Sequence, residues 1–595
     1  MHEIIRIKKN TLLRIVNYFL LPLFYLALAI IFSYPLILNF DSKIPNGYLQ
    51  YKNPIVWGDH LQTYSKAIEH RYNLEHFLDT LYHKEFCFSK DINECKINLI
   101  EKTFGVVFSP YWPITLFSYI APQIAAYNLN ILFSFVTTGL ASFWLARHFI
   151  ILLIKSKDKY INIAGYLIAL FSSLFCVLAH KRMIYLFAGQ KIGYLLFLGI
   201  LLILFIEKFL NKASIKNGVI ISVLLITLNL TEQFLLFYGL WYLGLRIFWY
   251  EAVERRLIIL RKLNFKSILK YLWIPVLISG LYLLSSLSKL GEINSSVVSS
   301  GRELDVIYFN SALISNLWTQ KYTGFETNIY LGFGIIILLS ALFQGIFVLI
   351  SKRKIPISIF FILFILVMLV ISLGLNTDMY KFLYDYFPTF KFSRTPTKSF
   401  FYIFPLITIL TSIIISKVLL SLVNKYTRSR KYIIGLLIAM IFFNIYTTYS
   451  RIQISLVKIP VNPVYSIPEN SKVMFLPLNR PIDPFGAIYE YFVINSKFLS
   501  VNGYTPFPKA EQEEFVEEYA ADFNIGDISK DILLGLKDGY GIEYIVVSKK
   551  YFNASRIPVP KLEGLENDLN VTLDALERSN VEKFEENDEW VVYRI

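Results

Sequence analysis

The chain has 595 residues, of which 55% are apolar and only 17% charged, and its mean hydropathy is +0.50. Apolar runs of about 18 residues or more recur along the first three quarters, which indicates a polytopic membrane protein and argues against a disordered chain, a disulfide scaffold or a nucleic-acid-binding domain. The net charge of +15 is explained first by basic loops on the cytoplasmic side of a membrane.

The membrane part is predicted to contain about eleven helices of roughly 20 residues, the length that crosses a hydrocarbon core of about 30 Å. The first of them follows basic residues and resembles a signal peptide, but it is too long and lacks a small-residue cleavage site. It is therefore predicted to be retained, with the N-terminus in the cytoplasm. The predicted spans lie at 11–38, 124–146, 161–180, 191–207, 214–230, 233–250, 271–288, 329–350, 355–374, 397–420 and 431–449.

The loops between these spans test the helix count, because Lys and Arg accumulate in cytoplasmic loops. With the N-terminus inside, every loop that should be cytoplasmic is basic. The basic residues are Lys155, Lys157, Lys159, Lys208, Lys212, Lys216, Arg255, Arg256, Arg261, Lys262, Lys266, Lys352, Arg353, Lys354, Lys425, Arg428, Arg430 and Lys431. Hydrophilic loops at 39–123, 289–328 and 376–395 then lie outside. The sequence predicts a multi-pass protein of the cell (inner) membrane with an extracytoplasmic C-terminal domain.

The tail at 450–595 differs in pattern from the membrane domain at 1–449. Three of its segments are rich in Val, Ile and Tyr and bounded by turn residues, as strands are, and two have helical spacing. The predicted strands are 471–478, 543–552 and 589–595, and the predicted helices are 509–523 and 528–541. Strands that alternate with helices predict a small α/β domain packed over the membrane part.

The chain has three cysteines. Cys176 lies in an apolar segment and is predicted to be inert packing. Cys87 and Cys95 share the first external loop, where a disulfide can form. Connectivity is not visible in sequence, so their pairing stays open.

The string "WGDHLQTYSKAIEHRYNLEHF" at 57–77 places Asp59 ahead of a segment with helical spacing in the first external loop. A carboxylate there is a candidate general base that takes a proton from an acceptor hydroxyl, or a ligand for a divalent metal. Asp is also a common helix N-cap, and spacing alone favours the cap. His60, Glu69 and His70 are candidates to join a site, but on an exposed amphipathic segment they are expected to be solvated.

The interiors of the predicted spans are nearly free of ionisable residues. Ion-coupled transporters usually place such residues at mid-membrane and often have broken, repeated helices. The ionisable residues here collect instead at the outer ends of the spans. This distribution favours an active site at the outer membrane surface over a pore.

Architecture and motifs together resemble the GT-C superfamily of integral membrane glycosyltransferases, and most of all its bacterial branch with a C-terminal extracytoplasmic α/β domain. The resemblance covers most of the chain, and its motifs are short. They are "WGDHLQTY", "AAYNLNILFSFVTTGLASFWLARHF", "AHKRMIYLFAGQKIGYLLFL", "NIYLGFGIIILL" and "YFPTFKFSRTPTKSFFYIFPLITIL". In the superfamily a carboxylate of the first external loop is the catalytic base, so the resemblance implies this role for Asp59. Members often carry two adjacent carboxylates, whereas here His60 follows Asp59.

The resemblance implies a hexosyl- or pentosyltransferase that takes a sugar from a polyprenyl-phosphate donor. Such a donor requires cations at the outer helix ends, where Arg offers a fork of donors and Lys a point charge. His180, Lys181 and Arg182 lie on a predicted external turn, and Arg394 and Lys398 begin and end "RTPTK" at the external entry to the span at 397–420. Snorkelling at the interface is the alternative role for these cations. Phosphate binding is favoured over snorkelling for Arg394. For Lys181 and Arg182 the sequence favours neither role over the other.

Glu326 and Glu232 are predicted at the same outer level. Either is a candidate second carboxylate that orients the acceptor or holds a divalent metal, or a helix-end residue favoured by the helix dipole. The implied partners are the polyprenyl-phosphate donor, a glycan, lipid or protein acceptor and membrane lipids, with no nucleic acid. The alternatives are a lipid or glycan transporter and a non-catalytic protein of envelope assembly.

Overall fold

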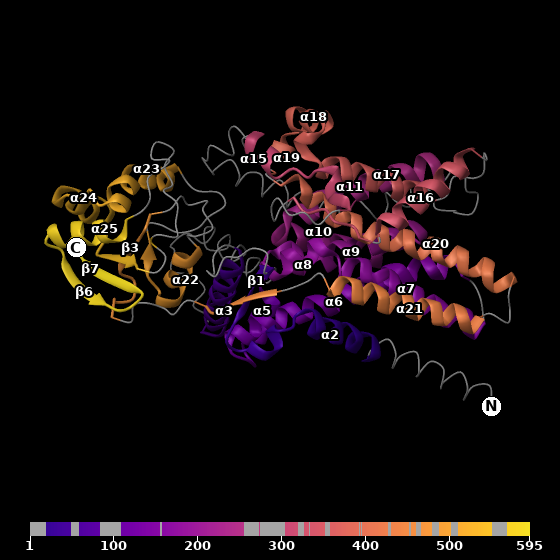
Figure 1. Ribbon diagram of the computed structural model, residues 1–595, viewed down its shortest axis with the longest axis horizontal. Helices are drawn as coiled ribbons and strands as arrows, with labels where there is room; N and C mark the ends of the chain where they lie inside the picture. The colour runs from indigo at the N-terminus through magenta and orange to yellow at the C-terminus, as the bar shows by residue number, and fades with distance from the viewer. Residues whose placement is uncertain are drawn as a thin grey trace.

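The computed structural model is mostly helical, and Figure 1 shows its long helices running side by side with a small sheet domain beyond one end of them. Helices dominate because a helix in hydrocarbon satisfies its backbone polar groups within one segment. The structure describes residues 19–48, 59–83, 109–154, 158–254, 273, 304–318, 327–332, 334–350, 357–391, 393, 395–425, 430–450, 454–459, 466–478, 487–500, 510–549, 552 and 568–595.

In these ranges, five helices are long and apolar enough to cross a membrane, which makes the chain a helical membrane protein. They are α6 (Gln123–Leu153), α7 (Lys159–Val177), α9 (Lys191–Asn211), η6 (Pro396–Tyr402) continued by α20 (Ile403–Lys425), and α21 (Arg430–Tyr449). Shorter helices with apolar stretches are α2 (Leu21–Phe32), α10 (Ile215–Thr231), α16 (Gly334–Ile350) and α17 (Ser358–Ser372). Helix α11 (Gln233–Trp249) follows α10. The count of about eleven spans stays a prediction, and the span at 271–288 lies outside the described residues apart from Trp273.

Helix α6 is central to the helical part, because it contacts α2, α7, α9 and α20. Gly139 of α6 faces the ring of Tyr25 from α2, and a Cβ at Gly139 would come within 2.4 Å of that ring. The Tyr25 hydroxyl lies 2.6 Å from Ser173 Oγ of α7. Small residues at helix crossings let membrane helices approach closely, so Gly139 sets where α2 crosses α6.

Short elements gather at the end of the helical part nearest the sheet domain (Figure 1). They are α3 (Asp59–His83) and α5 (Trp112–Phe117) from the first predicted external loop, and α8 (His180–Phe187) from the next one. Strand β1 (Ile44–Tyr48) pairs antiparallel with β2 (Ile454–Val457), with Ile44 opposite Val457. This pairing ties the first external loop to the start of the tail.

The sheet domain has five strands in the order β4-β3-β5-β7-β6. The elements are β3 (Lys472–Leu476), α22 (Ala487–Ser496), β4 (Leu499–Ser500), α23 (Ala510–Ile525), α24 (Lys530–Tyr540), β5 (Tyr544–Ser548), α25 (Leu569–Arg578), β6 (Glu582–Glu586) and β7 (Trp590–Arg594). β3 is parallel to β4 and β5, and β7 is antiparallel to β5 and β6. The three predicted strands are confirmed as β3, β5 and β7. The charged edge strand β6 was not predicted, because edge strands often lack an apolar run. The boundary between 1–449 and 450–595 stays a prediction.

Alternate residues of β3 point to two different cores. Val473 and Phe475 belong to the core that includes α22 and the membrane helices, whereas Met474 and Leu476 pack with residues of α23, α24 and α25. All five residues of β5 are buried, as expected for a central strand covered on both faces. Because α22 also contacts α3, one face of the sheet is directed toward the first external loop.

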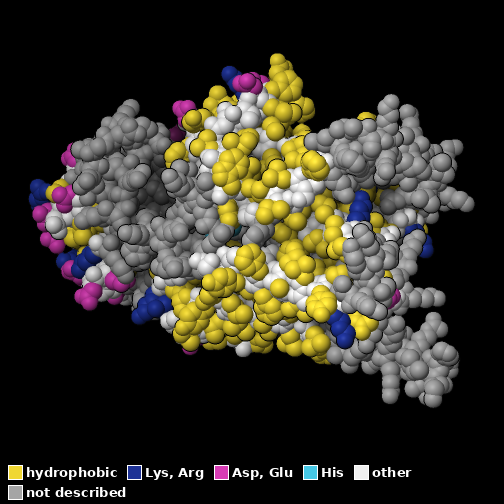
Figure 2. All heavy atoms as spheres, turned by 45° about the vertical axis from the view of Figure 1, so that its right-hand side comes forward, with side chains coloured by type: hydrophobic (Ala, Val, Ile, Leu, Met, Phe, Trp, Pro, Cys, Tyr) yellow, Lys and Arg dark blue, Asp and Glu magenta, His cyan; other side chains and the backbone are white. Residues whose placement is uncertain are grey.

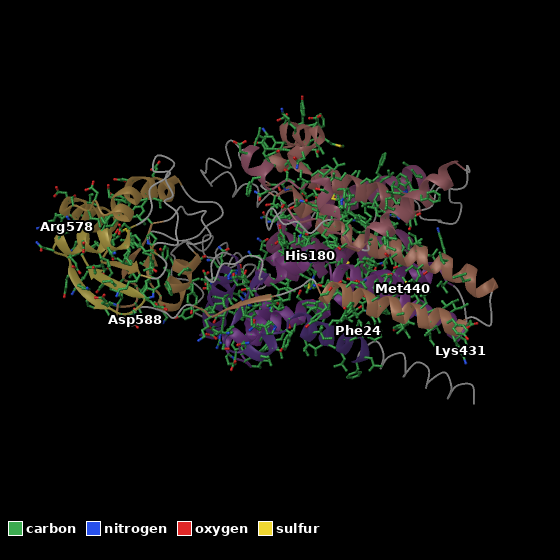
Figure 3. All side chains as sticks on the ribbon, viewed as in Figure 1. Phe24, His180, Lys431, Met440, Arg578 and Asp588 are labelled. Atoms are coloured by element: carbon green, nitrogen blue, oxygen red, sulfur yellow. The ribbon has the colours of Figure 1, made fainter. Side chains whose placement is uncertain are left out.

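Lys431, at the start of α21, and Asp588, in the sheet domain, lie at opposite ends of the molecule in Figure 3. In a background without Cys87 and Cys95, we expect Asp588→Cys to react with impermeant thiol reagents in intact cells. Lys431→Cys should react only after the membrane is opened, because the positive-inside pattern puts its loop in the cytoplasm. Labelling of both positions from outside would contradict the predicted orientation.

Candidate functional site

The first turn of α3 sits directly on the turn between α8 and α9. Gly189 in that turn has a φ of +75°, and a Cβ there would come within 2.3 Å of the His60 Cα. Thr63 Oγ1 donates a hydrogen bond to the Gly189 carbonyl oxygen at 2.7 Å. Glycine is the residue that combines a positive φ with so close an approach. Gly189 therefore fixes the start of α3 against the end of α8.

His60 and His70 are both buried, with 5% and 7% of their surface exposed. Burial lowers the pKa of His60 to about 4, although its hydrogen bond to the Ala188 backbone acts in the opposite direction. His60 is therefore neutral at pH 7. His70 Nδ1 lies 2.7 Å from Thr115 Oγ1 of α5. The expectation that these two residues are solvated is wrong, because α5 and the α8–α9 turn cover this face of α3.

Asp59 is the first residue of α3, one helical turn before Thr63. The contacts of His60 and Thr63 place its backbone at the end of the helical part nearest the sheet domain. The Asp59 side chain lies outside the described atoms. Its roles as base, metal ligand or helix cap therefore stay predictions.

Lys181 has no exposed surface and connects three segments of the chain. Its Nζ donates hydrogen bonds to the Asn328 carbonyl oxygen at 2.9 Å and to Thr397 Oγ1 at 3.0 Å. The same atom lies 5.0 Å from the centre of the Tyr185 ring. A snorkelling lysine keeps its charge in water, so this alternative is excluded for Lys181. Its ammonium group ties α8 to the segments around Asn328 and Thr397.

Arg182 has no exposed surface either. Its Nη1 donates to the Val177 carbonyl oxygen at 2.6 Å, and its Nη2 donates to the carbonyl oxygen and Oγ of Ser134 at 3.0 and 2.7 Å. Its guanidinium carbon lies 5.1 Å from the centre of the Phe135 ring. These contacts join α8 to α6 and to the end of α7. Snorkelling is excluded for Arg182 as well. Its guanidinium group stabilises the packing of α8 against α6 and α7.

The segments that Lys181 connects also carry other residues that the sequence predicts for the functional site. Thr397 directly precedes Lys398 and follows Arg394 by three positions, and Asn328 follows Glu326 by two. Lys398 is half-buried, with its Nζ 4.0 Å from the centre of the Phe234 ring. Arg394 and Glu326 lie outside the described residues, so their roles stay predictions.

Glu232 occupies the turn between α10 and α11, at the N-cap position of α11. It is half-buried and within electrostatic reach of Tyr194 in α9. This position agrees with the alternative in which the helix dipole favours an acidic residue near a helix start. A role as second carboxylate stays a prediction.

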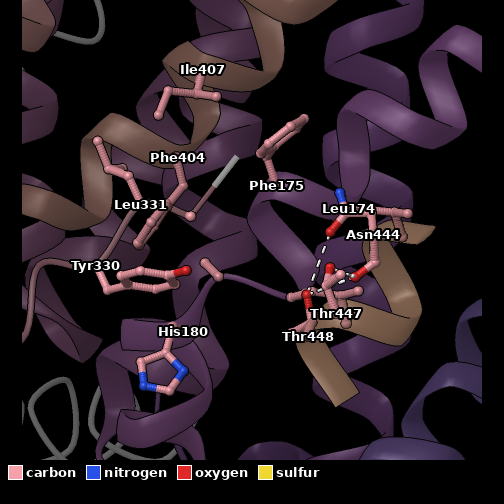
Figure 4. Close-up of a pocket in the computed structure, with 13 residues that line it drawn as sticks. Leu174, Phe175, His180, Tyr330, Leu331, Phe404, Ile407, Asn444, Thr447 and Thr448 are labelled. Atoms are coloured by element: carbon pink, nitrogen blue, oxygen red, sulfur yellow. Dashed lines mark hydrogen bonds between the residues drawn. The ribbon is translucent and has the colours of Figure 1, made fainter. Parts of the chain in front are cut away.

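A small cavity of about 50 Å³ lies where the end of α7 meets α20, α21 and the segment at 330–332 (Figure 4). His180 lines it, and its ring meets that of Tyr330 edge-on, with 5.8 Å between the ring centres. Ligand pockets usually measure about 300–1,000 Å³, whereas a water molecule requires about 10–15 Å³ on this scale. The cavity therefore suits a few waters and does not by itself accommodate a sugar.

No pattern in the sequence predicts the contact between α3 and the sheet domain. Lys66 Nζ lies 2.8 Å from Glu490 Oε1 of α22 and 2.8 Å from Glu69 Oε2. Burial raises the pKa of Glu490 against the opposing effect of Lys66. Burial would lower the pKa of Lys66, but the two carboxylates raise it. Because the centres of the Tyr64 and Tyr491 rings are also 6.0 Å apart, the sheet domain holds the helix that begins with Asp59.

A buried ion pair lies within the helical part, between α9 and α11. Arg246 Nε is 2.6 Å from Glu207 Oε1, and the Tyr242 hydroxyl donates to the same oxygen at 2.7 Å. The Arg246 and Glu207 side chains are 0% and 2% exposed. Glu207 is the last residue of the predicted span at 191–207 and Arg246 lies near the end of the span at 233–250, so the pair is compatible with span interiors that are nearly free of ionisable residues. Each charge reduces the cost of burying the other.

Metal and disulfide predictions fall mostly outside the described part of the chain. Within that part, no group of three His, Cys, Asp or Glu side chains could hold a metal ion, but the Asp59 side chain and Glu326 are not included. Cys87 and Cys95 also lie outside it, so both the divalent metal and the disulfide stay predictions. Cys176 is buried with its Sγ 3.2 Å from Thr408 Oγ1, which confirms packing.

The sequence matches no family model and no curated relative. Among solved structures, the chain is similar to the archaeal oligosaccharyltransferase AglB from Archaeoglobus fulgidus in complex with an inhibitory peptide and a dolichol-phosphate. The identity is 9% and the TM-score 0.30, and the similarity covers 76% of this chain and 62% of that chain. This chain thus spans less than two thirds of that protein, and a likeness this low does not establish a shared activity.

Proposed function

We propose that the protein is a membrane glycosyltransferase of the GT-C type that moves a sugar from a polyprenyl-phosphate donor to an extracytoplasmic acceptor. The supporting observation is the arrangement around α8. Lys181 near its start is bonded to Thr397, beside Lys398, and its far end is followed by Gly189, which holds the start of α3. α8 has 8 residues, so at about 1.5 Å per residue it is about 12 Å long. A bound sugar phosphate and two side chains can span that distance.

In the proposed reaction, Asp59 takes the proton of an acceptor hydroxyl, and the hydroxyl oxygen attacks the anomeric carbon from the face opposite the phosphate. The bond from the anomeric carbon to the phosphate oxygen breaks, the configuration inverts, and polyprenyl phosphate leaves. Arg394 and Lys398 stabilise the negative charge that the phosphate gains. A divalent cation beside Asp59 stays a prediction.

The buried cations receive a different role in this proposal. Arg182 donates hydrogen bonds to oxygens of Val177 and Ser134. Lys181 donates hydrogen bonds to Asn328 and Thr397. We therefore assign the contact with the donor phosphate to Arg394 and Lys398. Lys181 is a positioning residue, because it holds the segment that carries both of them.

The test is a transfer assay with the full chain in phospholipid nanodiscs and a panel of radiolabelled polyprenyl-phosphate sugars. Envelope extract supplies the acceptor. We expect label to move to an acceptor with release of polyprenyl phosphate. Movement of an unaltered lipid across the bilayer would support the transporter instead. A folded protein that does neither with any donor of the panel would support the non-catalytic role.

Substitutions of Arg394 separate phosphate binding from snorkelling. Arg394→Lys keeps the charge and the long stem, so a snorkelling residue should tolerate it. A bidentate phosphate ligand should not, because Lys lacks the planar fork. Losing one charge-assisted hydrogen bond costs about 1.5–3 kcal/mol, which is roughly ten- to over a hundredfold in donor affinity or turnover.

The matched control is Arg147→Lys, because the Arg147 guanidinium carbon lies 4.5 Å from the centre of the Tyr166 ring between α6 and α7. This control should leave the transfer rate unchanged. If Arg394→Lys and Arg394→Gln both match the parent, Arg394 is an anchor and the phosphate is held elsewhere.

A further inference from the structure

Helix α18 (Asp378–Tyr386) exposes a stripe of large apolar side chains. Met379, Phe382 and Tyr386 are 54%, 55% and 71% exposed. They are three and four residues apart, which places them on one face of the helix. In water, an exposed helix face normally carries polar residues. The apolar stripe of α18 is therefore unusual for a surface that faces water.

A second stripe runs along the same helix and is charged. Asp378, Lys381 and Asp385 are exposed and have the same spacing of three and four residues. The third side of the helix faces the protein core through the buried Tyr380 and Leu383. A helix with an exposed apolar face beside a charged one is the pattern of segments that lie in a membrane interface.

The position of α18 agrees with such a location. The apolar helix α17 ends at Ser372, and the short η5 (Gly374–Asn376) leads directly into α18. The Tyr380 ring packs against Phe390 of α19 (Pro388–Lys391), with 5.7 Å between the ring centres. Phe390 in turn contacts Trp241 of α11 at 5.7 Å. α18 therefore sits at the end of α17 that is followed by the predicted external loop.

The figures show how this helix projects. In Figure 1, α18 stands out sideways from the helical part, at the end of the bundle nearer the sheet domain. In Figure 2, charged side chains gather on one side of the uppermost projection, and hydrophobic side chains on its other side continue into the apolar surface of the long helices. The apolar side of this projection is thus continuous with the apolar surface of the long helices.

Neighbouring elements also expose large apolar side chains. α15 (Leu304–Phe309), η4 (Ile314–Leu317) and the residue that follows η4 contribute side chains that are more than half exposed. They are Tyr308, Phe309, Ile314 and Trp318. The Asn376 amide nitrogen donates to the Ala312 carbonyl oxygen at 2.8 Å, which attaches this segment beside η5. Tyr and Trp are enriched at membrane interfaces, where their rings lie at the level of the head groups.

We propose that α18 lies in the outer leaflet of the membrane, with Met379, Phe382 and Tyr386 inserted among the lipids and the charged stripe facing water. The occupant of the apolar stripe is the phospholipid of the bilayer itself. The inference rests on the membrane location and, for the choice of leaflet, on the predicted orientation, and not on the proposed transferase activity. Because α19 leads on to Thr395 and Thr397, the inserted helix holds the Lys181-bound segment at the level of lipid head groups.

Spin labels test this location in the full chain, in phospholipid nanodiscs. Cys87 and Cys95 are changed to Ser, and the buried Cys176 is kept. Labels at Phe382→Cys and Tyr386→Cys should be several-fold more accessible to oxygen, which concentrates in lipid, than to a water-soluble nickel complex. The matched controls Asp378→Cys and Asp385→Cys should show the reverse.

Two outcomes would overturn the inference. High accessibility to the nickel complex at all four positions would place α18 in water. Low accessibility to both reagents at Phe382 and Tyr386 would mean that protein, such as a second copy of the chain, covers the stripe. If Phe382→Cys does not fold, Met379→Cys reports on the same stripe.

Discussion

The Asp59→Asn variant is expected to lose about 10²–10⁴-fold of the transfer rate, the usual contribution of a general base. Asn has nearly the same size as Asp and caps helices almost equally well, but its amide does not accept a proton at neutral pH. The start of α3 is held by contacts of His60 and Thr63 with Gly189, which the substitution leaves in place. Expression and binding of the polyprenyl-phosphate donor should therefore stay normal.

Asp158→Asn is the matched control for this experiment. Asp158 is an established N-cap, because its carboxylate accepts a hydrogen bond from the Tyr160 backbone nitrogen at 2.8 Å at the start of α7. The control should keep full activity. If Asp59→Asn also keeps near-normal activity, Asp59 is only a helix cap and another group must deprotonate the acceptor.

The Glu207→Gln variant is expected to lower the free energy of unfolding by about 3–5 kcal/mol, the usual cost of removing one partner from a buried ion pair. Gln keeps the shape of the side chain, but the guanidinium group of Arg246 then stays buried without a counter-charge. Both side chains are almost fully buried, so water does not screen the loss. A double variant, Glu207→Met with Arg246→Leu, should recover most of the stability, since apolar replacements of buried pairs are often neutral.

The measurement is unfolding of the purified protein in detergent, followed for the parent, Glu207→Gln, the single variants Glu207→Met and Arg246→Leu, and the double variant. Glu75→Gln is the control, because Glu75 pairs with Arg71 at 2.8 Å on a partly exposed face of α3. Exposed pairs of this kind contribute at most about 1 kcal/mol. If Glu207→Gln is no less stable than Glu75→Gln, the buried pair does not stabilise the fold. If the singles cannot be purified, recovery of the double variant tests the pairing.

Local sequence patterns determined the elements of this protein. The apolar runs predicted α6, α7, α9 and α20, because a helix in hydrocarbon closes its backbone hydrogen bonds within one segment. In the tail, β3, β5 and β7 were predicted from runs of β-branched and aromatic residues between turns. Asp59 was singled out from the string around it and from the GT-C resemblance, and it does begin a helix.

The tertiary structure decided which charges and rings are buried and what they touch. The sequence predicted that Lys181 and Arg182 lie on an external turn. In the structure, segments distant in the chain enclose both side chains. The pairing of Glu207 with Arg246 and the contact of Lys66 with Glu490 also join segments that are distant in the chain. A hydrophobic period reports only on the segment that contains it, whereas the burial of a polar side chain depends on partners that folding brings from elsewhere.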